Sequence, residues 1–179
     1  MHLVVFEIIS CFNCNNLENS PEKQSARSSS YLLEDSIGFL AREASRAVGK
    51  RLLQHFETAG HHITLDQWLV LVTLHANHPQ NQHQIGDFCN KDRATVTRLL
   101  DSLEQRGYIL RSTDPADRRH NLVSLTSDGI KLTESLISYA QQTQAISSQD
   151  VTAEELAICK EVLRKVARNL ADAAPPGAS

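Results

Sequence analysis

The stretch that decides the fold is DRATVTRLLDSLEQRGYILRSTDPADRRHNLVSLT, residues 92–126. Its first half predicts an amphipathic helix, because apolar side chains recur at i, i+3, i+4 and i+7 along one face. Asp92 is a plausible N-cap for that helix, and Gly107 is well placed to end it. Its second half predicts two short strands, Tyr108–Leu110 and Leu122–Leu125, joined by a charged connection. The four apolar residues on the helix face are Val96, Leu99, Leu100 and Leu103.

The sequence upstream predicts two more helices. Ile85 and Phe88 are expected to face inward from a short helix, and Asn90, which tolerates a left-handed backbone, can make the turn that follows it. Before that, Thr64 and Gln67 have the spacing of a capping box, which predicts a helix that Pro79 stops. Two short helices joined by a tight turn and followed by a two-stranded hairpin describe a winged helix-turn-helix.

Longer helices are expected on both sides of this core. Apolar residues from Ile37 to Phe56 recur at three- and four-residue steps and predict an amphipathic helix that ends near Gly60. Thr126 can cap another long helix, and Thr152 with Glu155 forms a capping box for the last one. That last helix carries an a/d heptad seam, which fits either a partner helix in a second copy or packing within its own domain. The seam residues are Leu156, Cys159, Leu163, Val166 and Leu170.

Local charge indicates a nucleic-acid partner more clearly than global charge does. The formal net charge is only −3, yet residues 91–119 hold seven basic residues against five acidic ones. Short polar and cationic side chains in the first turns of the 92–107 helix suit the major groove, and the partial positive charge of a helix N-terminus favours phosphate. These side chains, which lie off the apolar face, are Arg93, Thr95, Thr97 and Arg98.

These residues carry a resemblance to a known family. The run IGDFCNKDRATVTRLLDSLEQRGYILRSTDPADRRHNLVSLTSDG, residues 85–129, resembles the core of the MarR (multiple antibiotic resistance regulator) family of bacterial transcription factors. Residues 95–107 match that family's recognition helix and its stop, and residues 114–126 match its wing. The similar helical order extends over about residues 32–172. This chain departs from the family pattern at Gly86, Asn90 and Lys91.

The resemblance implies a mainly α fold with a small β-hairpin wing, and a homodimer made by N- and C-terminal helices. It implies dimerisation helices at 31–60 and 127–173 around a winged core at 61–126. Residues 1–30 are expected to be a disordered extension, since they hold Asn, Ser, Pro and charge, and 174–179 a flexible tail. At the wing tip, the resemblance implies that Asp117 holds Arg119 in the minor groove and that Arg118 lies beside the backbone. The expected DNA-binding residues are Arg93, Ala94, Thr95, Thr97, Arg98, Asp117, Arg118 and Arg119.

The expected function is that of a cytoplasmic, ligand-responsive repressor that binds double-stranded DNA at a palindromic operator. The resemblance implies a small aromatic or phenolic effector, and no cofactor is expected. A winged-helix module for protein docking, without specific DNA binding, is the alternative. Such a module would need neither the wing-tip arginines nor the cationic first turns of the recognition helix.

Other functions are not favoured by the sequence. The chain has no Gly-rich phosphate loop, GxSxG elbow or HExxH motif, so an enzyme is not expected. Cys11 and Cys14 have the spacing of half a zinc site but lack a second half, and the histidines between His55 and His83 include no i, i+4 helical pair, so no metal site is expected. The apolar start contains Glu7 and is too short to span a bilayer, so no membrane partner is expected.

Overall fold

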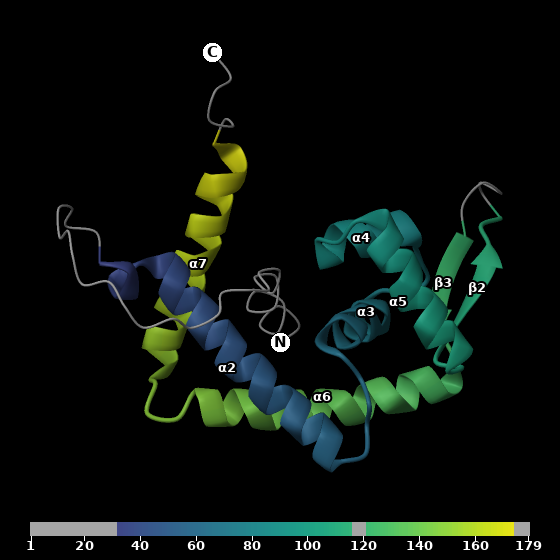
Figure 1. Ribbon diagram of the computed structural model, residues 1–179, viewed down its shortest axis with the longest axis horizontal. Helices are drawn as coiled ribbons and strands as arrows, with labels where there is room; N and C mark the ends of the chain where they lie inside the picture. The colour runs from purple at the N-terminus through teal and green to yellow at the C-terminus, as the bar shows by residue number, and fades with distance from the viewer. Residues whose placement is uncertain (1–31, 116–120, 174–179) are drawn as a thin grey trace, which may run out of the picture.

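The computed structural model describes residues 32–115 and 121–173, and it confirms a mainly helical fold with a small antiparallel sheet (Figure 1). A 3-10 turn, η1, precedes the first long helix, and three short helices and the sheet lie between that helix and the last two long helices. In chain order the elements are η1 (Leu33–Asp35), α2 (Ile37–Thr58), α3 (Leu65–Ala76), β1 (Gln80–Asn81), α4 (Gln82–Cys89), α5 (Arg93–Gln105), β2 (Ile109–Thr113), β3 (Asn121–Leu125), α6 (Ser127–Ser147) and α7 (Ala153–Asp172).

Local capping explains where most helices begin. The capping boxes predicted at Thr64 and Thr152 are both formed, and the Asp92 carboxylate and Thr126 hydroxyl accept backbone N–H groups of the helices they start. Asn90 adopts the left-handed conformation after α4, with φ 49° and ψ 49°. Gly107 has φ +74° after α5, so it ends that helix as predicted.

The core lies where α2, α3, α4 and α5 pack together with α6 and β3. Its largest members are Trp68 and Phe56, whose rings meet edge to face at 5.6 Å between centroids. From α5, the predicted apolar face supplies Val96, Leu100 and Leu103, each with no exposed surface. Burial of this face fixes which side of α5 remains toward solvent.

The interpretation of Phe88 as an inward residue is wrong. Its side chain is 39% exposed, whereas the next residue, Cys89, is buried. Ile85 and Cys89 lie four residues apart and therefore share one face of α4, and that face packs against the Thr73 side of α3. Phe88 lies about 100° further round the helix from Cys89 and so points away from the core.

The sheet has three strands where the sequence predicts two. β1 pairs with β3, with Gln80 opposite Val123, and the strand order is β1-β3-β2. A two-residue strand carries no alternating pattern, so nothing in the sequence could reveal it. Because β1 leads directly into α4, this pairing fastens the start of α4 to the wing strand.

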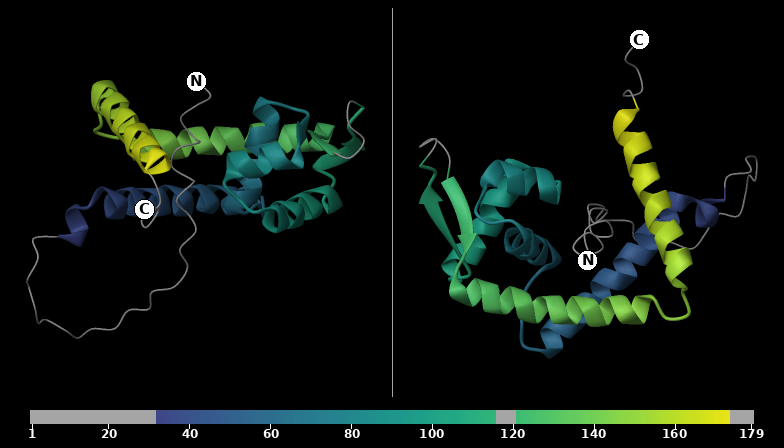
Figure 2. Two further views of the ribbon diagram at one scale, coloured as in Figure 1. Left: turned by 90° about the horizontal axis from the view of Figure 1, so that it is seen from above. Right: turned by 180° about the vertical axis from the view of Figure 1, so that it is seen from behind.

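The long helices form a frame beside this lobe. Figure 1 and Figure 2 show α6 extending from the wing to the far end of the molecule, where α7 departs from it, while α2 crosses α6 between its two ends. α7 buries none of its residues among those described, and Leu170 is 73% exposed. Ile37 and Leu40, on the apolar face predicted for this helix, are 46% and 55% exposed. None of the helices in residues 32–115 and 121–173 is long and apolar enough to cross a membrane.

A tight joint connects the end of α5, the wing and α6. The Thr126 hydroxyl donates to the Gly107 carbonyl at 2.7 Å, and the Thr126 N–H donates to the Tyr108 carbonyl at 3.0 Å. One turn into α6, Gly129 lies so close to the residue before β2 that a β-carbon there would be 1.9 Å from the Tyr108 carbonyl oxygen. The start of α6 is thus held directly against the end of α5.

Candidate nucleic-acid interface

The candidate interface is the exposed side of α5. Arg93, Ala94 and Arg98 are exposed there, as predicted for the side opposite the buried stripe. Asp92 starts the helix by accepting from the Thr95 N–H at 2.9 Å and from the Thr95 hydroxyl at 2.7 Å. The hydroxyl bond from Thr95, followed by its backbone bond, lowers the pKa of Asp92. The cap therefore contributes to stability above the unfolded-state pKa of an aspartate and is lost as pH falls through the lower, folded-state value.

The two threonines of this helix are held by internal hydrogen bonds. The Thr97 hydroxyl donates to the Arg93 carbonyl at 2.9 Å, and the Gln82 amide of α4 donates to the same hydroxyl oxygen. The Thr95 hydroxyl donates to Asp92 and accepts from the Arg98 guanidinium at 3.2 Å. Both side chains are half-buried, so they are less available for contact with DNA than their place among the expected DNA-binding residues implies.

Three of the basic residues counted between 91 and 119 have structural roles. The Lys91 ammonium is 3.1 Å from the Asp66 carboxylate and is mostly buried, which explains how a lysine fits at this position. The Arg106 guanidinium donates to the His62 carbonyl at 2.7 Å and lies over the Tyr108 ring.

Arg111 is the third of these structural residues. Its guanidinium binds the carboxylates of Asp101 at 2.7 Å and Glu104 at 3.3 Å. Within the described part of this segment, Arg93 and Arg98 are therefore the exposed arginines that remain to meet a polyanion.

A hollow adjoins the N-terminus of α5. It has a volume of about 720 Å³ and lies between the first turns of α4, the start of α5 and the first residue of β3. Gln82, His83 and Asn121 were not among the predicted site residues, and only their position in space brings them there. The β1–β3 pairing places them, and that pairing has no sequence signal. The lining residues are Gln82, His83, Gly86, Asp87, Lys91, Arg93 and Asn121.

The wing itself is only partly described. β2 and β3 are paired from Ile109 opposite Leu125 to Thr113 opposite Asn121, so the connection between them lies at the free end of the hairpin. Asp117, Arg118 and Arg119 fall outside the described residues, and their predicted roles stay predictions.

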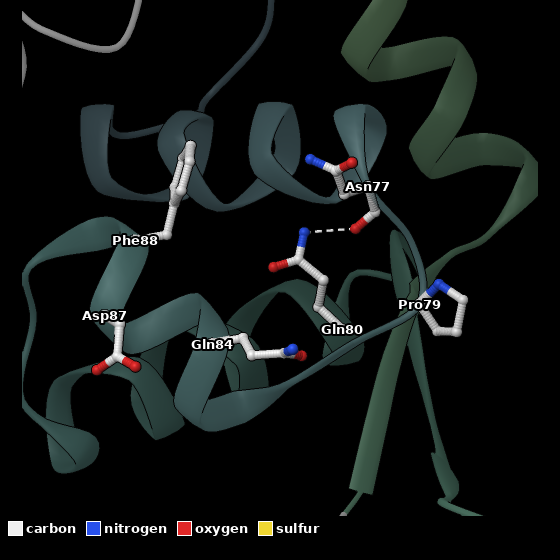
Figure 3. Close-up of a pocket in the computed structure, with 6 residues that line it drawn as sticks. All are labelled: Asn77, Pro79, Gln80, Gln84, Asp87 and Phe88. Atoms are coloured by element: carbon white, nitrogen blue, oxygen red, sulfur yellow. Dashed lines mark hydrogen bonds between the residues drawn. The ribbon is translucent and has the colours of Figure 1, made fainter.

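A second hollow, on the other side of α4, is chemically different. It has a volume of about 620 Å³ and presents amides, one carboxylate and no cation. In Figure 3 the Phe88 ring projects at one end and Pro79 lies at the other, while the Gln80 amide donates to the Asn77 carbonyl. This hollow is poorly suited to phosphate. Its lining residues are Asn77, Pro79, Gln80, Gln84, Asp87 and Phe88.

The loop between α2 and α3 contacts both the frame and the recognition helix. The His61 ring is 3.3 Å from the Ser135 hydroxyl of α6 and 6.2 Å, between centroids, from the Tyr139 ring. The neighbouring His62 carbonyl accepts from Arg106, directly after α5. A displacement of this loop would therefore change the contact between His62 and Arg106 at the end of α5.

Cys89 is expected to react slowly. Burial, followed by the Asp66 charge, raises its pKa from 9.0 to about 11, despite a hydrogen bond with Thr73 and the Lys91 charge. A two-unit rise lowers the thiolate population at pH 8 by about 100-fold. With Cys11, Cys14 and Cys159 replaced by serine, Ellman's reagent should label Cys89 at least about 100-fold more slowly than in urea.

The matched control for this labelling is a variant that retains only Cys159, which is exposed in the described chain. Its labelling rate at a protein concentration too low for self-association should differ little between buffer and urea. A native Cys89 rate close to its rate in urea would show that the thiol is accessible. No group of three or more His, Cys, Asp or Glu side chains that could hold a metal ion occurs among the described residues.

Comparison with known proteins agrees with this geometry. The MarR family model matches residues 63–120. The chain is 26% identical over 149 residues to the transcriptional repressor NicR of Pseudomonas putida, covering 83% of this chain and 93% of NicR. It is 30% identical over 131 residues to the organic hydroperoxide resistance transcriptional regulator of Bacillus subtilis, covering 73% of this chain and 86% of that protein.

Two solved structures extend the similarity to the fold. BpsR of Bordetella bronchiseptica, whose DNA binding is regulated by 6-hydroxynicotinic acid, matches with a TM-score of 0.70 and 27% identity over 82% of this chain and all of that one. The S. aureus MepR–DNA complex matches with a TM-score of 0.68 and 27% identity over 75% and 98%. This chain is therefore a transcriptional regulator and not an enzyme, and it belongs to the MarR family.

Proposed function

We propose that this regulator is a ligand-responsive repressor that binds a palindromic operator as a homodimer. The observation that carries the proposal is the exposed side of α5, where Arg93 and Arg98 remain available while the neighbouring basic residues bind carboxylates or carbonyls. Guanidinium groups on the first turns of a recognition helix suit guanine edges and phosphates in the major groove. The protein-docking alternative gives these two arginines no role.

The proposed DNA-binding surface has two parts. The first turns of α5, with Arg93, Ala94, Thr95, Thr97 and Arg98, enter the major groove. The wing reaches the adjacent minor groove with Arg119, which Asp117 steadies while Arg118 lies along the backbone. A narrow minor groove concentrates negative potential, so one inserted guanidinium gains more there than on an open surface.

The proposed dimer uses residues 31–60 and 127–173, on either side of the winged core at 61–126, with 1–30 and 174–179 as flexible ends. The exposed apolar residues of the described chain support it, because most of them gather on η1, the first half of α2, the end of α6 and α7. A large apolar surface of this kind is typical of an interface. These residues are Leu32, Leu33, Ile37, Leu40, Ile146, Val151, Ile158, Val162 and Leu170.

The proposed effector is a small aromatic compound. The similarity to BpsR, which responds to 6-hydroxynicotinic acid, supports this class. The loop between α2 and α3 offers a route by which the effector could act. In this loop His61 contacts Ser135 of α6, and the His62 carbonyl accepts from Arg106, directly after α5. A gel-shift titration repeated with 6-hydroxynicotinic acid and with benzoate tests whether an aromatic acid releases the DNA.

The arginines provide the test of DNA binding. Arg98→Ala and Arg119→Ala should each weaken operator binding by about 10- to 100-fold, because each removes a guanidinium from a groove. The measurement is a gel-shift titration on a duplex selected from genomic fragments, repeated at two salt concentrations. Affinity should fall as salt rises, since bound phosphates release counterions.

Arg168→Ala is the matched control, because it removes an exposed arginine from α7. It should leave operator affinity within about twofold, as expected for a surface substitution away from the DNA. Failure to enrich any duplex with the full-length protein would reject the proposal in favour of the docking module. An operator whose affinity is unaffected by either arginine substitution would reject the assigned residues.

A further inference from the structure

The hydrogen bonds of Thr97 limit how α5 can read a base. A threonine hydroxyl has one hydrogen to donate and two lone pairs to accept with. In this chain the hydrogen is used on the Arg93 carbonyl, and the Gln82 amide occupies one lone pair. The guanine O6 and N7, adenine N7 and thymine O4 are all acceptors, so a hydroxyl whose hydrogen is already used cannot bond them.

The methyl group of Thr97 has no such restriction. Thr97 is half-buried and lies at the edge of the exposed side of α5 that faces α4, while Arg93 and Ala94, one turn earlier, are exposed. Ala94, three residues earlier, presents a second methyl group on the same side. Two neighbouring methyl groups flanked by guanidinium groups suit a base pair whose major-groove edge carries a methyl group, which is a thymine.

We infer that the methyl groups of Thr97 and Ala94 recognise a thymine 5-methyl group, and that Gln82 is a positioning residue that keeps the Thr97 hydroxyl bonded within the protein. The inference rests on the proposed function and specifies what its recognition helix reads. Gln82 lies on α4, and its amide donates to the Thr97 hydroxyl and, at 3.4 Å, to the Arg93 carbonyl, so the role assigned to it is exerted through Thr97. The start of α4 is fastened by the β1–β3 pairing, which holds Gln82 in place.

Removing one methyl group from the DNA provides the first test. The probe is the selected operator duplex in which each thymine in turn is replaced by deoxyuridine, which lacks only the 5-methyl group. One thymine per half-site should weaken binding by about fourfold when replaced, the value of one buried methyl group. Replacement in both half-sites of a dimer-bound operator should weaken it by about 15-fold.

Substitution of Thr97 provides the second test. Thr97→Val keeps a methyl group and removes the hydroxyl, so it should keep operator affinity within about twofold and still distinguish thymine from deoxyuridine. Thr97→Ser keeps the hydroxyl and removes the methyl group, so it should bind about fourfold more weakly and lose that distinction. Melting temperature and circular dichroism establish that both variants are folded.

The role of Gln82 has its own readout. Gln82→Ala should reduce the ratio of thymine to deoxyuridine affinity, because the Thr97 side chain is then held by the Arg93 carbonyl alone and can rotate its methyl group away from the bases. In the Thr97→Val background the same substitution should leave that ratio unchanged, since no hydroxyl remains to be held. A merely structural role for Gln82 would lower both affinities together and leave the ratio unchanged in either background.

The outcomes separate this inference from the proposed function. A selected operator that Thr97→Val no longer binds, or one in which no thymine is sensitive to loss of its methyl group, would overturn the inference and leave the repressor proposal standing. Failure to select any duplex would overturn both. Three results together would support the inference. Thr97→Val would keep operator affinity and the distinction between thymine and deoxyuridine, Thr97→Ser would lose that distinction, and one thymine in each half-site would be sensitive to loss of its methyl group.

Discussion

Gly129→Ala is expected to lower the free energy of unfolding by about 3 kcal/mol or more. The added β-carbon would lie 1.9 Å from the Tyr108 carbonyl oxygen, 2.9 Å from its carbonyl carbon and 3.3 Å from its α-carbon. These are backbone atoms, so no side-chain rotation can relieve the overlap, and α6 must separate from the Tyr108 backbone. Urea denaturation followed by circular dichroism measures the change.

Gly38→Ala is the control for this substitution. Gly38 also lies near the start of a helix, but a β-carbon there would have nothing within 4 Å. Alanine should therefore leave stability unchanged or raise it by up to about 1 kcal/mol through its better helix propensity. Equal effects of the two substitutions would show that the Tyr108 joint does not constrain the fold.

Leu163→Glu is expected to raise the dimer dissociation constant by about 100-fold or more, because the proposed interface would have to bury a carboxylate in place of an apolar side chain. Leu163 lies in the heptad seam of α7, a helix that buries none of its residues among those described. Sedimentation equilibrium at micromolar concentration measures the association. Operator affinity should fall in parallel, since a monomer contacts one half-site.

Arg168→Glu also introduces a carboxylate into α7, and it provides the matched control. By helical periodicity Arg168 lies opposite the seam, and it is exposed. The variant should remain a dimer under the same conditions. A Leu163→Glu protein that sediments as a dimer would show that α7 does not form the interface, and the paired measurement would exclude a general effect of added charge.

The sequence was most informative where structure depends on neighbouring residues. Thr64, Asp92, Thr126 and Thr152 each start a helix as predicted, because a cap needs only its own side chain and the next three residues. Asn90 makes its turn for a similarly local reason. Phe88 shows the limit. In an eight-residue helix, periodicity does not determine which side faces inward. Packing against α3 buries Cys89 and leaves Phe88 exposed.

In the candidate site, too, the sequence predicted local features but not contacts between different elements. Periodicity placed Arg93 and Arg98 on the exposed side of α5, because the buried stripe determines its opposite. Charge counting could not show that Lys91 and Arg111 are bound to carboxylates on other elements. It also gave no sign that Gln82 holds Thr97, since those two residues belong to different helices. Each of these contacts depends on tertiary packing.

The short pairing of β1 with β3 determines how each subunit can adapt to DNA. It joins the start of α4 to the wing strand, while Thr126 and Gly129 join the other end of the wing to α6. A lobe restrained at both ends would present its proposed major-groove and minor-groove contacts at a fixed separation. Operators whose half-sites differ in spacing must then be accommodated by a change in the angle between the two lobes of the proposed dimer, and not by movement of the wing relative to its own recognition helix.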